Sequence, residues 1–378
     1  MGWAPNRRPG LPAPQSAAMH AETSMSELAE LSRSARGEVL GSLLQRSPRP
    51  DPATLIGKGK IEEARALAQG SGATCVIFDN DLSPTQLRNL EQALGLKVVD
   101  RTQLILDIFA RRARTREGQL QVELAQLNYL LPRLAGQGTV LSRLGGGIGT
   151  RGPGEQQLEF DRRRIRARIQ KLRQGIERVR SERALHREHR REARWLTVAM
   201  VGYTNAGKST LFNALTKARV EASSRLFATL DPTVRALRLD AHHQVLLSDT
   251  VGFIRRLPSH LVASFRATLE ELESAALLLH VTDASHPERE LHDAAVESLL
   301  EEVGVAATPR LQVWNKIDLL EPGERDRLPS GPADVAVSAR TGEGLDALRQ
   351  HIAASTAHQS GWEAKHQPVS SAVTAQAI

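Results

Sequence analysis

The chain has 378 residues, of which 40% are hydrophobic and 25% charged, a composition typical of a globular protein with two or three domains. A single cysteine, Cys75, excludes an internal disulfide and indicates a reducing compartment, which we take to be the cytoplasm; beside the apolar residues 76–78 we expect it to be buried. No apolar run approaches the roughly 18 residues that span a bilayer, so we expect no membrane anchor.

The first 25 residues are rich in proline and lack the apolar core of a signal peptide, so they are expected to form a disordered leader. Residues 26–114 alternate between strand-like and helix-like patterns, which predicts a small α/β domain. Ser83 followed by Pro84 is typical of a helix start. A glycine–lysine turn at residues 57–60 fits a flexible connection as well as a phosphate contact. The expected strands are 38–44, 73–79 and 96–99, and the expected helices are 58–69, 84–94 and 102–114.

Residues 115–194 are predicted to form an antiparallel helical hairpin. Leucines spaced alternately four and three residues apart run from Leu120 to Leu134, and a second apolar stripe runs from Leu158 to Val179. Two such stripes bury one seam between two helices.

The basic charge of the chain is concentrated in this hairpin. Residues 161–194 contain fourteen Lys and Arg against five Asp and Glu, a formal net charge of +9, whereas the rest of the +7 chain sums to −2. A purely solvated face usually mixes the two signs, so the excess favours a polyanionic partner, with nucleic acid ahead of a membrane surface.

A segment with six glycines, residues 144–154, lies between the two predicted helices. It is either a flexible connector or a tip that enters a confined RNA site. Its length favours the second, because close-packed helices need only about two to eight connecting residues. The candidate RNA-binding residues are Arg143, Gly145, Gly146, Gly147, Gly149, Arg151, Arg162, Arg163, Arg166 and Arg173.

Residues 195–355 are predicted to form a doubly wound α/β domain, with a flexible tail at 356–378. The expected strands are 196–201, 234–239, 244–248, 275–282, 310–314 and 334–337, and the expected helices are 208–217, 258–274, 287–303 and 344–353.

The most informative motif of this domain follows its first strand. It fits the P-loop pattern, in which glycines let backbone N–H groups approach a phosphate at a helix N-terminus. Lys208 is expected to reach the β- and γ-phosphates, and the Ser209 hydroxyl to ligate Mg²⁺. The candidate phosphate-binding residues are Gly202, Tyr203, Thr204, Asn205, Ala206, Gly207, Lys208, Ser209 and Thr210.

Three further motifs each follow one of the later predicted strands. They therefore lie at the carboxyl edge of the sheet, where ligands bind in open α/β sheets. In the first, the Asp249 carboxylate can hold a Mg²⁺-bound water and the Gly252 N–H can bond the γ-phosphate. In the second, the Asp318 carboxylate can accept two N–H bonds from guanine, each worth roughly 1.5–3 kcal/mol. The third offers a backbone N–H to the guanine oxygen. The motifs are Asp249-Thr250-Val251-Gly252, Asn315-Lys316-Ile317-Asp318 and Ser338-Ala339-Arg340. Together they predict an enzyme that hydrolyses GTP with Mg²⁺, with Lys208 and Gly252 as candidate catalytic residues.

With these residues in place, the chain resembles the HflX family of P-loop GTPases, within the Obg–HflX group. The likeness runs from about residue 38 to residue 320. The strings that carry it lie at residues 50–54, 56–60, 82–84, 86–90, 114–118, 149–155, 161–165 and 227–233.

The resemblance implies a cytoplasmic GTPase that docks on the large (50S) ribosomal subunit and its rRNA. There it would dissociate or recycle stalled ribosomes, often under stress, with the hairpin and its glycine-rich loop near the peptidyl transferase centre. The family has also been linked to subunit maturation, so an RNA-binding assembly factor without splitting activity stays the alternative. We expect a monomer in either case.

The resemblance also assigns the first switch segment. Thr229, within Phe227-Ala228-Thr229-Leu230-Asp231, would ligate Mg²⁺ together with Ser209 and sense the γ-phosphate; the residues alone do not separate Thr229 from Thr233. Phe253 stands where many GTPases have a water-orienting Gln, and its ring cannot hydrogen-bond water. We therefore expect slow intrinsic hydrolysis that a docked partner stimulates.

Overall fold

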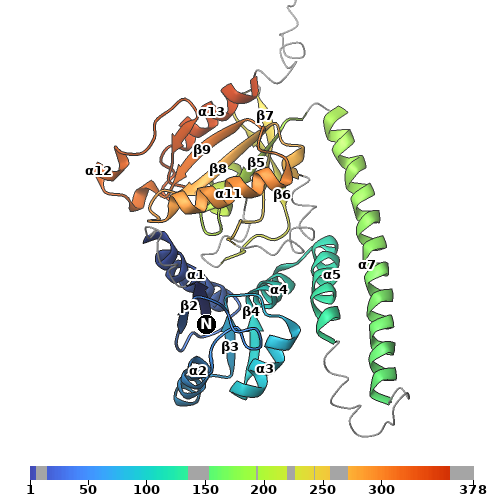
Figure 1. Ribbon diagram of the computed structural model, residues 1–378. Helices are drawn as coiled ribbons and strands as arrows, with labels where there is room; N and C mark the ends of the chain where they lie inside the picture. The colour runs from blue at the N-terminus through green and yellow to red at the C-terminus, as the bar shows by residue number, and fades with distance from the viewer. Residues whose placement is uncertain are drawn as a thin grey trace, which may run out of the picture. The chain divides into compact units, whose positions relative to one another are not determined.

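The computed structural model describes residues 1–5, 15–134, 153–192, 195–218, 226–241, 243–255 and 271–357 (Figure 1). The chain divides into two compact units. The first comprises Met1–Arg180 with Arg225–Phe227 and Leu257–Phe265, and the second comprises Ser181–Ser224, Ala228–Arg256 and Arg266–Ile378.

The first unit contains two pairs of parallel strands with helices packed on them. The pairs are β1 (Gly2–Pro5) with β2 (Leu44–Ser47), and β3 (Cys75–Phe78) with β4 (Lys97–Asp100). The helices are α1 (Gln15–Ser34), α2 (Lys58–Ser71), α3 (Pro84–Leu94) and α4 (Arg101–Arg112). Ser83 forms a capping box with Gln86, which confirms the predicted start of α3. Cys75 is exposed, so the expectation that it is buried was wrong.

The beginning of the chain differs from the prediction. Residues 1–25 were expected to be a disordered leader, but β1 and α1 occupy much of this range. The Met1 ammonium donates a hydrogen bond to the Ile77 carbonyl over 2.6 Å, and Leu28 and Leu31 of α1 are buried. The second strand also begins at Leu44 rather than at residue 38. Four-residue strands carry too few alternating positions to be recognised in a sequence.

A buried ion network holds α1 and α4 together in this unit. Arg101 is 2% exposed; its guanidinium contacts the Glu27 carboxylate and donates to Asp79 over 2.7 Å. The Ser24 hydroxyl donates to the same Asp79 carboxylate over 2.6 Å. Removing one member of such a network leaves the remaining charges buried without a partner or water. That change is expected to lower the free energy of unfolding by about 3–5 kcal/mol.

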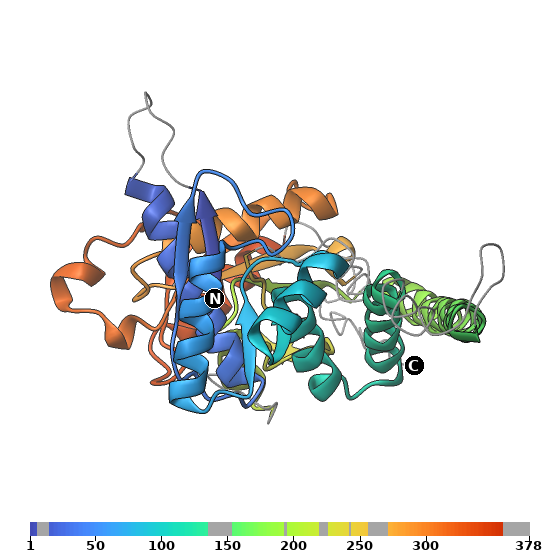
Figure 2. The ribbon, with the colours of Figure 1, turned by 60° about the horizontal axis from the view of Figure 1, so that its bottom comes forward.

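Helices α5 (Arg116–Arg133) and α7 (Pro153–Glu192) lie side by side, as Figures 1 and 2 show in teal and green. Thr115 caps α5 by accepting from the Gly118 N–H over 3.0 Å. Ile169 and Leu172 of the predicted stripe are buried. Arg168 joins the helices through a bidentate pair with Glu123, with N–O distances of 2.6 and 2.7 Å.

The second unit is built on a six-stranded sheet in the order β10-β9-β8-β5-β7-β6. All neighbours are parallel except the edge strand β6, which is antiparallel to β7. The strands are β5 (Thr197–Val201), β6 (Thr233–Arg238), β7 (Gln244–Asp249), β8 (Leu277–Asp283), β9 (Arg310–Asn315) and β10 (Asp334–Ala336). Every predicted strand is present within three residues, and the predicted doubly wound α/β class is confirmed.

Helices cover both faces of this sheet. The helices are α8 (Lys208–Thr216), α11 (Arg289–Val303), α12 (Pro322–Arg325) and α13 (Leu345–Ala357). Residues of α8 and α13 share a core cluster with Leu277, Leu279 and Val281 of β8. The alternate residue His280 instead contacts Asp293 of α11, because successive strand residues point to opposite faces. Helix α13 runs two residues beyond the predicted end of the domain, and the predicted helix 258–274 lies largely outside the described residues.

Candidate nucleotide-binding site

The predicted P-loop joins β5 to α8 at the carboxyl edge of the sheet. Gly207 ends the loop at φ +91°, and a Cβ there would sit 2.3 Å from Nδ2 of Asn315. Any side chain would therefore push these two motifs apart as well as strain the backbone. Lys208 begins α8 directly after this glycine.

Lys208 is turned back onto the loop. Its ammonium donates to the carbonyls of Gly202 and Tyr203 over 2.9 and 2.8 Å. Burial lowers the pKa of Lys208 to about 8, because the desolvation of its charge outweighs the attraction of Asp249. The side chain is thus a cation held in a dry site, which strengthens its interaction with an anionic ligand.

Three oxygen-bearing side chains from separate segments meet beside Lys208. The Ser209 hydroxyl lies 2.7 Å from the Thr229 hydroxyl and donates to Asp249 Oδ2 over 2.7 Å. The Thr229 hydroxyl donates to the same oxygen over 3.0 Å. Burial raises the pKa of Asp249, and its Oδ1 is buried without a hydrogen-bond partner among the described residues.

This set of hard oxygen donors fits Mg²⁺, which prefers carboxylate, hydroxyl and water ligands. Ser209 and Thr229 would supply the direct ligands, and the unpartnered oxygen of Asp249 leaves a contact for a metal-bound water. The rival residue, Thr233, instead lies in β6 opposite Asp249 in the strand register.

The segment after Asp249 is joined to the P-loop by backbone hydrogen bonds. The Thr204 N–H donates to Phe253 O over 2.7 Å, and the Phe253 N–H donates to Gly202 O over 3.1 Å. The Phe253 side chain is 6% exposed, so a buried ring occupies the position of the expected water-orienting residue. A Cβ at Gly252 would lie 2.9 Å from the Thr204 Cα and 3.1 Å from the Lys208 ammonium, so a side chain there would clash with the P-loop backbone.

The Tyr203 side chain extends these contacts in two directions. Its hydroxyl accepts from the Arg255 N–H over 3.0 Å. Its ring stacks on His292 of α11, with centroids 3.8 Å apart and planes 4° from parallel. Burial lowers the pKa of His292 to about 4, so its imidazole is neutral at pH 7. Sequence reasoning missed His292, since no motif marks it.

Asn315 links the P-loop to the motif at residues 338–340, the other motif predicted to bind guanine. Its Nδ2 donates to Ala206 O over 2.8 Å, and its Oδ1 accepts from the Ala339 N–H over 3.0 Å. Asp318 Oδ1 accepts from the Ser338 hydroxyl over 2.6 Å, which aims the carboxylate. The structure therefore places these residues where one ligand can touch all three segments.

Sequence reasoning also missed Asp283, the last residue of β8. Its carboxylate accepts from the Lys316 ammonium over 2.6 Å, and Lys316 itself adopts a left-handed backbone at φ +66°. An acidic residue at the carboxyl end of a buried strand was the available signal.

Replacing Asn315 with Ala is expected to weaken GDP binding by tenfold or more and to lower the free energy of unfolding by about 2–4 kcal/mol. The residue is 1% exposed, so the change leaves the buried Ala206 carbonyl and the half-buried Ala339 N–H unpaired, at about 1–3 kcal/mol each. Urea unfolding and nucleotide titration measure the two effects. Gln350→Ala, at an exposed position of α13, is the control.

Two further sets of predicted residues are the start of the first switch segment and the candidate RNA-binding residues. The Phe227 ring packs edge-to-face on Phe109 at 4.6 Å within the first unit, and the Leu226 N–H donates to Ser34 there. Among the candidate RNA-binding residues, Arg163, Arg166 and Arg173 are exposed on α7 and Arg162 is half-buried. The remaining six lie outside the described residues: Arg143, Gly145, Gly146, Gly147, Gly149 and Arg151.

Comparison with known families agrees with this geometry. Residues 22–110 match the family described as GTP-binding GTPase N-terminal, and residues 112–190 match GTP-binding GTPase Middle Region. Residues 197–316 match the family described as 50S ribosome-binding GTPase.

Individual relatives are similar over most of their length. GTPase HflX of Caldanaerobacter subterraneus subsp. tengcongensis is 52% identical over 88% of this chain and 76% of its own. GTPase HflX of Escherichia coli is 49% identical over 90% of this chain and 80% of its own. The crystal structure of the SsGBP and GDP complex covers 90% of this chain and 97% of that chain, with a TM-score of 0.50 and 25% identity. From these similarities and the nucleotide-site motifs, the chain belongs to the GTPase HflX family and is a GTP-hydrolysing enzyme.

Proposed function

We propose that this GTPase binds the large (50S) ribosomal subunit in its GTP form, dissociates stalled ribosomes, and leaves after hydrolysis. The observation that carries the proposal is the exposed row of arginines on α7, in a chain whose GTPase domain matches the 50S ribosome-binding family. Arginine is well suited to phosphate because its planar guanidinium donates in pairs. A ribosomal partner also implies the cytoplasm.

The basic charge on α7 is only partly neutralised within the helix. Glu159 lies 3.3 Å from Arg163 and 3.9 Å from Arg166, and both arginine side chains are more than half exposed. Exposed pairs of this kind contribute little stability, so an RNA phosphate can replace the carboxylate at small cost. Ile169 and Leu172 of the same helix are buried, whereas these arginines are exposed.

For hydrolysis, Lys208 would stabilise the charge that develops on the phosphates, and the Gly252 N–H would hold the γ-phosphate. Bound Mg²⁺ would neutralise phosphate charge through Ser209 and Thr229. The buried Phe253 ring leaves the nucleophilic water unoriented, so we expect the docked subunit to complete the site.

Among the described helices, none is both long enough and apolar enough to cross a membrane.

Sedimentation of ribosomes through sucrose with this protein and a non-hydrolysable GTP analogue tests the proposal. Free subunits should increase, with the protein on the large one. Binding without an increase in free subunits would favour the assembly-factor alternative, and absence of binding would contradict both.

A triple variant tests the role of α7 in the same experiment. Arg163, Arg166 and Arg173, all exchanged for Ala, should abolish most subunit association and reduce the slope of log affinity against log salt by about 2–3. A matched triple of exposed arginines in the second unit, Arg235, Arg238 and Arg327, should leave both unchanged.

A further inference from the structure

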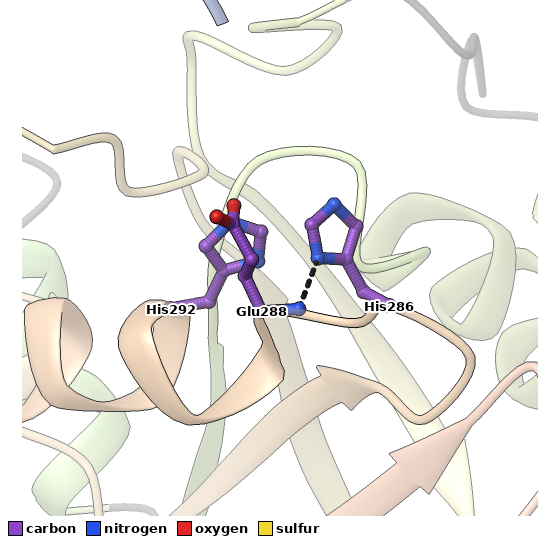
Figure 3. A group of neighbouring side chains, drawn as sticks. All are labelled: His286, Glu288 and His292. Carbon is purple, nitrogen blue, oxygen red and sulfur yellow. Dashed lines mark hydrogen bonds between the residues drawn. The ribbon is translucent and has the colours of Figure 1, made fainter. Parts of the chain in front are cut away.

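Two imidazoles and a carboxylate gather on the segment between β8 and α11, outside the predicted nucleotide motifs. His286 and Glu288 precede α11, and His292 lies in its first turns. Figure 3 shows the three side chains rising from the same side of the chain. Each offers a ligand atom, and these atoms all lie within 4.8 Å of one another.

We propose that His286, Glu288 and His292 form a binding site for one divalent transition metal ion, best fitted by Zn²⁺. Two histidine nitrogens and one carboxylate oxygen are a common zinc ligand set, and three protein ligands leave a further position for water. The set differs from the all-oxygen group of Ser209, Thr229 and Asp249, because imidazole favours zinc and its neighbours over Mg²⁺.

The positions of the two histidines argue for a site rather than an ordinary turn. The Glu288 N–H donates to Nδ1 of His286 over 3.1 Å, which by itself is a local turn contact. That contact does not account for His292, whose ring centroid lies 4.3 Å from that of His286. Two imidazoles this close can both direct a ring nitrogen to one metal ion, together with the Glu288 carboxylate.

The surroundings hold His292 in place before a metal binds. His292 is half-buried and fixed by its parallel stack on Tyr203, so little of its side-chain freedom remains to be lost. Its imidazole is neutral and keeps a lone pair for a metal. If His286 binds through Nδ1, the hydrogen bond from the Glu288 N–H must be given up, a loss that is small beside the gain of a zinc–ligand bond.

The three ligands span only seven residues of the second unit, so the site needs no contribution from the first unit. The site is also next to the P-loop, because the ring of the P-loop residue Tyr203 stacks on His292. The Tyr203 hydroxyl in turn accepts a hydrogen bond from the Arg255 N–H. A bound ion would fix the imidazole on which the P-loop tyrosine rests.

Zinc titration of the full chain tests the proposal. The protein is first stripped with a chelator and kept in Mg²⁺ and GDP, so that the nucleotide site is filled. Isothermal titration with Zn²⁺ should give one tight equivalent. Co²⁺ should give visible absorption bands of four- or five-coordinate geometry, with imidazole nitrogen among the ligands.

Variants separate this site from adventitious binding to the other histidines. Glu288→Gln, which keeps the side-chain shape, should weaken Zn²⁺ binding at least tenfold, and His292→Ala should weaken it by more than about 100-fold. Glu290→Gln, at an exposed position, and His351→Ala, at a half-buried position of α13, should bind like the unaltered protein.

Thermal unfolding in the chelator shows whether each variant still folds. If the unaltered protein takes up no tight equivalent, or if folded Glu288→Gln and His292→Ala bind Zn²⁺ as it does, the proposal is wrong. Neither outcome would bear on GTP hydrolysis or subunit binding, which are measured separately.

Discussion

Replacing Lys208 with methionine is expected to lower kcat for GTP hydrolysis by about 10²–10³-fold, the usual loss when one preorganised charge donor is removed. The ammonium donates to two carbonyls of the phosphate-binding loop and would lie 3.1 Å from a Cβ at Gly252, so phosphate oxygens would be its natural partners. Single-turnover hydrolysis at saturating GTP measures the effect.

The same variant should not be less stable, which separates a catalytic role from a structural one. Because the folded pKa of Lys208 is about 8, below its unfolded value of 10.5, burial of the charge opposes folding at neutral pH. That cost, about 3 kcal/mol, is complete below pH 8 and disappears as the pH rises through 10.5. Urea unfolding should show Lys208→Met at least as stable as the original at pH 7, with the difference shrinking by pH 10. A Met variant that is much less stable at pH 7 would point to a structural lysine.

Replacing Asp318 with asparagine is expected to weaken GTP binding by about 10²–10⁴-fold and to remove the preference for guanine. The carboxylate is half-buried and is aimed by the Ser338 hydroxyl, so its two charge-assisted bonds to the base should be worth roughly 1.5–3 kcal/mol each. The asparagine side chain offers one acceptor and one donor. This pair matches xanthine, which has a ring N–H to donate and, in place of the guanine amine, an oxygen to accept.

Competition titrations with GTP, ATP and XTP check this expectation. XTP affinity should rise while GTP affinity falls, and Asp326→Asn, an exposed position shortly after the motif, should change neither. If Asp318→Asn bound GTP as before, the base would have to be recognised elsewhere.

The fold of the second unit follows from its sequence because its central strands, β5 and β8, are buried on both faces. Residues 197–201 are all buried, and such a buried run followed by the P-loop pattern, Gly202 to Ser209, has few alternative structures. The first unit was harder to predict. Its four-residue strands β1 and β2 are defined by pairing with each other and by the Met1 contact with Ile77, which local patterns do not encode.

The candidate site likewise contains residues that the sequence predicts and residues that it does not. Lys208, Ser209, Asp249 and Asn315 belong to motifs with fixed spacing, and the structure brings them together. Asp283 and His292 carry no such spacing; their positions depend on how β8 and α11 meet the loops after the sheet has formed.

Helix α7 is a single helix of 40 residues, about 60 Å long at 1.5 Å per residue. It ends five residues before β5, the strand that leads into the P-loop. A lever of this length amplifies angles: a tilt of about 5° at the Glu192 end carries the Pro153 end through about 5 Å, close to one helical turn.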